Sequence, residues 1–420
     1  MNQKLLITSF LFFLIVLVNP RDFPFPNVPL IYPAFVIALA ILGIRRIVLG
    51  IKRTLSLQLL IVIYWCYLTC LRNLYGYPLK LGDIPYLIEP LVILVFAGSV
   101  ASFRNDGAKI GTCALVGAIS LSSGLGLWIH FIGEPIKSLY SMVQKTSTGT
   151  IIDIATKTYG HPAVNGRAGL ANSAFLFSYQ NAVALSLIVT NFMDPKRSLI
   201  KNYLIFFPYF AILFLEMIVC AERATVGSVL IGVLFYMVLA AKRVVNFKSI
   251  FSILFVSIIA VFLIQYSSSR DSNNLQHRSL NEAKLTMRLL VMPMTAIETI
   301  YHQPFGAGTI SHHYEKVARK KGYYKNGHPI GAHNHYANII MYTGIVGIIL
   351  TSVLFILLTK KILMWKKIND SGIELIIASA CVTSLVHATS HNAGFFKLEP
   401  ATLIIFGLLW GIIDPRSGEY

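Results

Sequence analysis

Long apolar segments follow one another along almost the whole chain, and they constrain the fold more than any other feature. Twelve such runs, separated by polar stretches, are centred near residues 12, 37, 63, 92, 121, 179, 212, 232, 257, 348, 381 and 407. A helix needs about 20 mainly apolar residues to cross the hydrocarbon core of a bilayer. The pattern therefore predicts an all-α polytopic integral membrane protein with about twelve transmembrane helices, forming a single membrane domain over residues 1–420.

Composition supports this class of fold. Hydrophobic residues make up 55% of the chain and charged residues only 13%, whereas soluble domains carry about 25% charged residues. An ordinary soluble enzyme is therefore excluded. The first run, Leu5 to Val18, has the length of a signal-peptide core, but Asn19-Pro20-Arg21 follows it in place of a small-residue cleavage site. We therefore expect it to remain as an uncleaved span.

Basic residues are distributed unevenly between alternate short loops, and this predicts the orientation. One set of loops carries sixteen Lys and Arg, and the alternating set carries five. Lys and Arg near helix ends resist translocation, so the richer set and both termini are predicted to be cytoplasmic. The richer set is Arg45, Arg46, Lys52, Arg53, Arg104, Lys109, Lys196, Arg197, Lys201, Lys242, Arg243, Lys248, Lys360, Lys361, Lys366 and Lys367, and the poorer set is Arg21, Arg72, Lys80, Arg223 and Lys397.

Two long polar segments then fall on the opposite, outer face. They run from Gly133 to Arg167 and from Ser267 to Ala332, the second lying between the ninth and tenth spans. The second has nine basic and four acidic residues, a net charge of +5, which predicts an anionic partner beside the membrane. Within it, Leu280 to Ile300 is interrupted by Pro293 and is predicted to form a kinked amphipathic helix against the membrane.

A histidine-rich motif stands where this segment enters the tenth apolar run. Residues 331–336 read Gly-Ala-His-Asn-His-Tyr, and Gly344 and Gly347 follow. We therefore expect His333 at the outer membrane–water boundary, where a histidine could deprotonate a hydroxyl presented from outside. On spacing alone, the alternative is that these polar residues only cap a helix.

Two linked motifs resemble a known family. His333-Asn334, nine further residues and then G-x-x-G resemble the signature of the bacterial O-antigen ligase and polymerase family of polytopic glycosyltransferases. Upstream, Met-Arg-Leu at 287–289 followed by His-Gln-Pro-Phe-Gly-Ala-Gly at 302–308 resembles that family's Arg-Leu helix and its Pro-Phe/Leu-Gly-x-Gly turn. Arg223 at the start of the eighth span and Arg167 before the sixth resemble further family arginines. Glu222 departs from the family pattern. An ion pair between Glu222 and Arg223 would compete with the binding of a ligand by Arg223.

The resemblance implies a function. It implies transfer of a sugar chain from undecaprenyl pyrophosphate to an acceptor hydroxyl at the periplasmic face of a bacterial inner membrane, by inversion, without metal or cofactor. It implies a GT-C-like fold with a helical periplasmic cap. His333 would be the base and arginines would bind pyrophosphate. The substrate-binding candidates are Arg288, Arg223, Arg167, Arg278, Arg270 and Asn334.

Several alternatives remain open. One dominant outer loop favours a ligase with lipid A-core as acceptor, whereas the 133–167 segment keeps open a polymerase that extends a lipid-linked glycan. A protein-glycosylating relative is a further option. The acids Glu89 and Glu216 within apolar runs suggest a proton-coupled transporter, although the chain shows no repeated halves. Basic residues at 319–321 are expected to contact lipid headgroups or acidic glycan. Nucleic acid is not an expected partner, because the basic residues form no stripe interleaved with aromatic residues.

Overall fold

The computed structural model shows a bundle of α-helices. It describes residues 2–18, 29–76, 78, 83–103, 106–133, 174–194, 199–220, 223–240, 292–308, 316, 319–320, 324–325, 328–329, 334–366 and 372–413. In this part of the chain the only strands are β1 (Tyr324–Lys325) and β2 (His328–Pro329), which pair as a short antiparallel hairpin. The predicted all-α fold is confirmed, while the segment 133–167 lies almost wholly outside the described residues.

Eleven of the twelve predicted spans coincide with described helices. These are α1 (Gln3–Val18), α2 (Ile31–Leu42), α3 (Ile44–Leu74), α4 (Ile84–Ala101), α5 (Gly107–Phe131), α8 (Ala174–Met193), α9 (Leu199–Cys220), α10 (Arg223–Leu239), α16 (His335–Lys366), α17 (Gly372–His387) and α18 (Pro400–Gly411). The run centred near residue 257 lies outside the described residues. Five helices, α3, α4, α5, α16 and α17 with its extension to Ser390, are long and apolar enough to cross a membrane.

The connection between α2 and α3 differs from the sequence prediction. A basic loop was expected there, but only Gly43 separates the two helices, with a φ of 80°. Glycine adopts this positive φ without the steric cost of a Cβ. Arg45, Arg46, Lys52 and Arg53 therefore belong to the first turns of α3.

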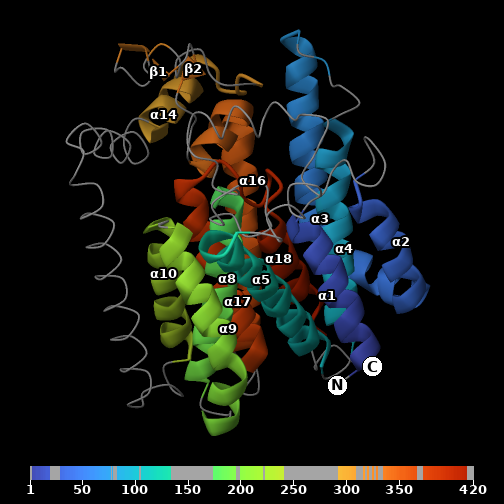
Figure 1. Cartoon of the computed structure of the whole chain (residues 1–420). Helices are drawn as coiled ribbons and strands as arrows, with labels where there is room; N and C mark the ends of the chain where they lie inside the picture. The colour runs from blue at the N-terminus through green and yellow to red at the C-terminus, as the bar shows by residue number, and fades with distance from the viewer. Residues whose placement is uncertain are drawn as a thin grey trace, which may run out of the picture.

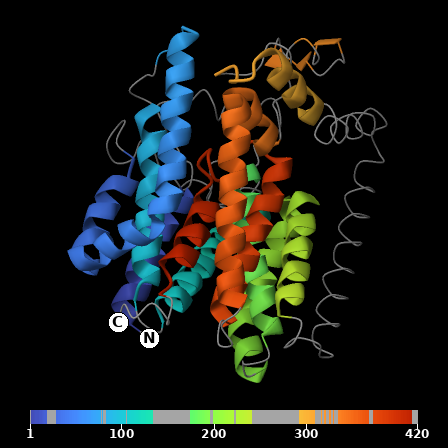
Figure 2. The same ribbon diagram turned by 180° about the vertical axis from the view of Figure 1, so that it is seen from behind.

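Helices distant in sequence pack into one bundle (Figures 1 and 2). α4 packs against both α3 and α18, α5 against α1, and α17 against α8 and α10. The start of α1 and the end of α18 lie at the same end of the bundle (Figure 1). There Arg46 donates to the Ser102 carbonyl oxygen at 2.7 Å and Arg53 to the Gly411 carbonyl oxygen at 3.0 Å. We call this the basic end.

The opposite end carries the short helix α14 (Met292–His302), the β hairpin and the last turn of α3 (Figures 1 and 2). Pro293 is the second residue of α14, so it stands where a helix tolerates proline. α14 buries Thr295, Ala296 and Thr299. On its other face Met294, Ile297 and Tyr301 are exposed, which suits a helix at a membrane surface. The part of the predicted kinked helix before residue 292 lies outside the described residues.

Candidate functional site

The tenth span is a helical hairpin. α16 is broken at Gly344, which has φ 58° and ψ −136°, values that only glycine adopts readily. The arm 335–343 folds back along the arm 345–366, and the rings of Tyr336 and Phe355 meet across the hairpin with centroids 6.0 Å apart. A Cβ on Gly347 would lie 3.0 Å from the Ile339 carbonyl oxygen, so this glycine allows the arms to approach closely.

The hairpin sets the distance of Asn334 from the break. The place of His333 at the outer membrane–water boundary stays a prediction, because this residue lies outside the described part of the chain. The first arm has nine residues, so at 1.5 Å per residue Asn334 lies about 13 Å from the break, toward the interior of the bundle. Tyr336 donates to the Leu385 carbonyl oxygen near the end of α17 at 2.7 Å, which fixes this depth. A broken helix was not foreseen because both arms are apolar.

The glycine-rich turn 304–308 docks into the break. Ile345 N–H donates to the Pro304 carbonyl oxygen at 2.8 Å, and the N–H groups of Ala307 and Gly308 donate to the carbonyl oxygens of Met341 and Tyr342 at 2.9 and 3.0 Å. The backbone of Gly306 lies so close to Gly344 that a Cβ on either residue would collide with the other segment. The turn therefore satisfies backbone groups that the broken helix leaves without helical partners.

The last turns of α3 hold the same turn from the other side. The Tyr67 hydroxyl donates to the Phe305 carbonyl oxygen at 2.8 Å, and the Tyr75 hydroxyl donates to the Gly306 carbonyl oxygen at 3.3 Å. The two motifs that carry the family resemblance thus form one structural unit. We call this unit, made of residues 304–308 and the hairpin around Gly344, the clasp.

Asn334 caps the first arm of the hairpin. Its Oδ1 accepts from the Ala337 N–H at 3.0 Å, and its carbonyl oxygen accepts from the Asn338 N–H at 3.0 Å. The capping interpretation is therefore correct for this residue. Because Oδ1 is occupied, its side-chain NH₂ is the group left to donate to a substrate.

The loop 391–399 between α17 and α18 packs against the start of the hairpin. His335 is buried, with Nδ1 3.4 Å from the Asn392 carbonyl oxygen. A Cβ on Gly394 would overlap the His335 ring, so glycine is needed there. The Tyr179 hydroxyl donates to the Ala393 carbonyl oxygen from α8. Two elements, α8 and the first arm of α16, therefore fix this loop beside the start of the hairpin.

Buried polar contacts link the loop to the start of α10. The ring of Tyr179 lies 4.1 Å, centroid to centroid, from that of His387, whose Nε2 is 3.3 Å from the Ser178 hydroxyl oxygen. Thr225 in the first turn of α10 donates to the Ser178 carbonyl oxygen at 3.4 Å. These contacts bring the first turn of α10, which begins at Arg223, to the same end of the bundle as Asn334.

Two charged residues of the loop 391–399 were not among the candidates from sequence. Glu399 is fully buried and caps α18, accepting from the N–H groups of Ala401 and Thr402. Burial raises the pKa of this carboxyl to about 7, against the hydrogen bonds, which favour the charged form. Lys397 is exposed, and its Nζ lies 5.5 Å from the centroid of the Tyr342 ring. A short loop gives no sequence pattern that would single out either side chain.

The remaining candidates are not placed by the structure. The side chain of Arg223 is outside the described part, although its backbone begins α10 as predicted. Glu89 in α4 and Glu216 in α9 are described and buried, and both make contacts within the protein. The candidates that lie outside the described residues are His333, Arg288, Arg167, Arg278 and Arg270.

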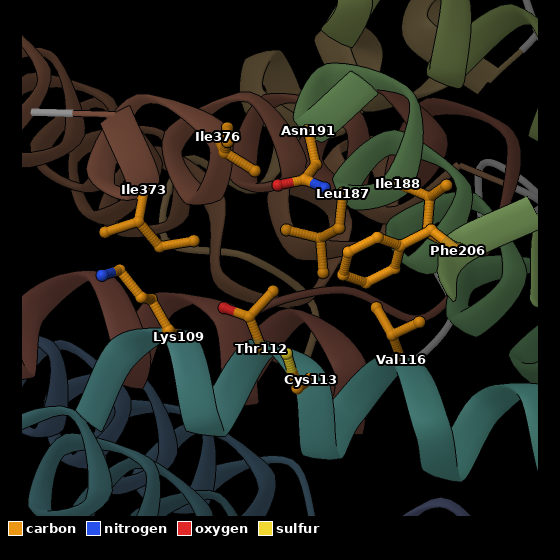
Figure 3. A pocket seen from close by; sticks show the side chains of 10 residues that line it. All are labelled: Lys109, Thr112, Cys113, Val116, Leu187, Ile188, Asn191, Phe206, Ile373 and Ile376. Carbon is orange, nitrogen blue, oxygen red and sulfur yellow. The ribbon is translucent and has the colours of Figure 1, made fainter. Parts of the chain in front are cut away.

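A small cavity lies at the basic end, away from the clasp. Its volume is about 30 Å³, and its lining comes from α5, α8, α9 and α17 (Figure 3). Lys109 and Asn191 are among its polar residues, and Phe206, Leu187 and Ile376 among its apolar ones. The cavity has room for about one water molecule. It therefore does not compete with the motif-bearing end as a site for a glycan.

The fold and the clasp define a polytopic all-α membrane protein in which the described residues of both motifs gather at one end of the bundle. The family model for O-antigen ligase matches residues 208–352, about a third of the chain, from the middle of α9 into the second arm of α16. This match includes the turn 304–308, the first arm of the hairpin and the break at Gly344, and it confirms the resemblance to the O-antigen ligase family over that segment. No match was found among curated proteins. The match therefore supports a function of the O-antigen ligase or polymerase type in general.

Proposed function

We propose that this protein is an O-antigen ligase that transfers a polysaccharide from undecaprenyl pyrophosphate to lipid A-core. The reaction would take place at the periplasmic face of a bacterial inner membrane, with both chain termini in the cytoplasm. The observation that carries the proposal is the clasp, because the turn 304–308 and the G-x-x-G segment, distant in sequence, bind each other through backbone hydrogen bonds. Their union fixes the far end of the helical arm 335–343, which follows His333 in the sequence.

The distribution of cations supports the orientation. Arg46 and Arg53, from the richer basic set, lie at the basic end. Lys397 and Arg72, from the poorer set, lie at the other end near Tyr342. Lys- and Arg-rich ends face the cytoplasm in most polytopic membrane proteins. The clasp would therefore face the periplasm, where the lipid-linked glycan and its acceptor meet.

The proposed chemistry is a single displacement. The acceptor hydroxyl oxygen forms a bond to the anomeric carbon as the bond from that carbon to the phosphate oxygen breaks. Undecaprenyl pyrophosphate leaves with the electron pair, and His333 takes the hydroxyl proton. Arginines at positions 288, 223, 167, 278 and 270 are proposed to bind the diphosphate, since a guanidinium can give two parallel hydrogen bonds to phosphate. Asn334 would donate its free NH₂ to the bound substrate.

The experiment is a lipopolysaccharide gel from a strain that lacks this gene. Wild type, His333→Ala and His130→Ala are returned separately on a plasmid, and membrane levels of each protein are measured. His130 is an exposed histidine in the last turn of α5, outside both motifs, and is the control. We expect wild type and His130→Ala to restore the O-antigen ladder, whereas His333→Ala should give lipid A-core without a ladder. The expected loss is at least about a hundredfold, typical of losing a general base.

The other outcomes are equally informative. If the deletion strain shows lipid A-core carrying a single repeat unit, the protein is a polymerase and the ligase assignment is wrong. An unchanged ladder in that strain would contradict both activities. A ladder restored to near wild-type level by His333→Ala would overturn the assignment of the base while leaving the transfer reaction in place.

A further inference from the structure

A lysine that no family motif contains faces the clasp. Lys397 belongs to the short loop before α18, and its Nζ lies over the Tyr342 ring, at the top of the first arm of α16. Gly394, three residues before Lys397 in the same loop, packs against the His335 ring near the start of that arm. The ammonium group therefore lies beside the arm that begins at His335.

The backbone around Lys397 is held in place from several sides. The N–H groups of Lys397 and Glu399 both donate to the Gly394 carbonyl oxygen at 3.2 Å. Phe395 and Phe396 are buried, and Phe396 packs on Tyr64 of α3 with ring centroids 5.2 Å apart. Leu398 has a φ of 36°, a conformation that a non-glycine residue adopts only when its surroundings impose it. The loop thus presents the lysine from a rigid base.

The Lys397 side chain is exposed, yet the protein around it removes part of the water that would surround its ammonium group. Its side chain is exposed, while the surrounding protein lowers its pKa by removing water from the charged form. The ion pairs recorded in the described part of the chain join Arg72 to Asp83 and Lys109 to Asp106, and neither includes Lys397. A cation so placed is stabilised when an anion binds in front of it.

We infer that Lys397 binds an anionic phosphate oxygen of the lipid-linked donor, in front of the first arm of α16. The inference rests on the proposed function and adds to it a binding residue from the loop 391–399. Tyr342 supports the lysine through its ring face, which keeps the ammonium beside the arm. Lys397 holds the donor and takes no proton in the reaction.

The test measures binding, not transfer. Purified full-length protein in nanodiscs is titrated with undecaprenyl pyrophosphate and, separately, with undecaprenol, which lacks the phosphates. The variants are Lys397→Met, which keeps an unbranched apolar side chain over Tyr342 but removes the charge, and Lys397→Arg, which keeps the charge. Lys360→Gln, which removes the charge of an exposed lysine near the end of the second arm of α16, is the control.

We expect Lys397→Met to weaken undecaprenyl pyrophosphate binding about tenfold, with undecaprenol binding unchanged. Lys397→Arg and Lys360→Gln are expected to bind within about threefold of wild type. Unchanged diphosphate binding by Lys397→Met would overturn the inference. An equal loss for both lipids would also overturn it, because it would indicate a structural role. Wild-type protein that binds neither lipid would contradict the proposed function itself.

Discussion

The two ends of the bundle are held together by different chemistry. At the basic end, arginine side chains reach carbonyl oxygens at the ends of neighbouring helices, as Arg53 does with Gly411. At the clasp, the bonds join backbone to backbone, and glycines let the chains touch. A side-chain bond can be replaced by another long polar residue or by water. A backbone bond at a broken helix requires one conformation, so the clasp tolerates less change.

The comparison also separates two roles within the motifs. Gly306, Gly344 and Gly347 are explained by space and backbone angle alone. Asn334 is explained in part, because it caps a helix and keeps an NH₂ group free. These residues build the frame. We therefore expect the transfer reaction to depend on other side chains, those of His333 and the arginines, which this frame would position.

The largest expected effect is at Gly344. Gly344→Ala would place a Cβ against the Pro304 carbonyl oxygen in a backbone conformation that alanine disfavours. We expect a loss of about 4 kcal/mol in stability and no O-antigen transfer. Thermal unfolding in detergent and the lipopolysaccharide gel measure the two effects. Gly76→Ala is the control, because Gly76 also has a positive φ of 78° but no atom within 4 Å of its Cβ position.

The control isolates the backbone angle from the collision. Gly76→Ala should cost about 1–2 kcal/mol, the usual penalty for a left-handed residue with a side chain. Equal losses for the two variants would show that close contact at the clasp has no special weight.

A smaller effect is expected from Glu399, and it depends on pH. Burial raises the pKa of Glu399 from 4.5 to about 7, so the folded protein holds this proton more tightly than the unfolded chain. Stability from this group is complete below about pH 4.5 and is lost as the pH rises toward 7, by a few kcal/mol at most. Glu399→Gln keeps an oxygen for the cap and cannot ionise. Its melting temperature should therefore fall less than that of wild type between pH 5 and pH 7.5.

One outcome would contradict the prediction for Glu399. If wild type and Glu399→Gln lose stability in parallel over that range, the buried carboxyl is not protonated in the folded protein. The hydrogen bonds from Ala401 and Thr402 would then outweigh burial.

The smallest effects compare one side-chain bond from each end. Tyr67→Phe removes the hydrogen bond to Phe305, and Arg53→Met removes the bond to Gly411. Each should cost about 1 kcal/mol of stability. Only Tyr67→Phe should also lower transfer, by about three- to tenfold at equal protein level, because it loosens the clasp. A greater loss of transfer in Arg53→Met would reverse the assignment of function to the two ends.

The sequence determined the class of fold because each span must satisfy its own backbone hydrogen bonds in lipid, which makes long apolar runs reliable markers of helices. It also determined the two motifs and the start of α10 at Arg223. It did not reveal that α2 meets α3 at a single glycine, since basic residues were taken to mark a loop and here they lie in a helix.

Only the tertiary structure decided how the motifs meet. Hydropathy is the same for a straight helix and for a hairpin with two apolar arms, so the break at Gly344 becomes visible only when the turn 304–308 fills it. Lys397 and Glu399 gain their positions in the same way, from a loop fixed by Tyr179, His335 and Phe396. The pattern of apolar residues indicates which segments are buried in the membrane or the bundle. The candidate site depends on which segments, distant in sequence, form backbone contacts, and that pattern does not contain this information.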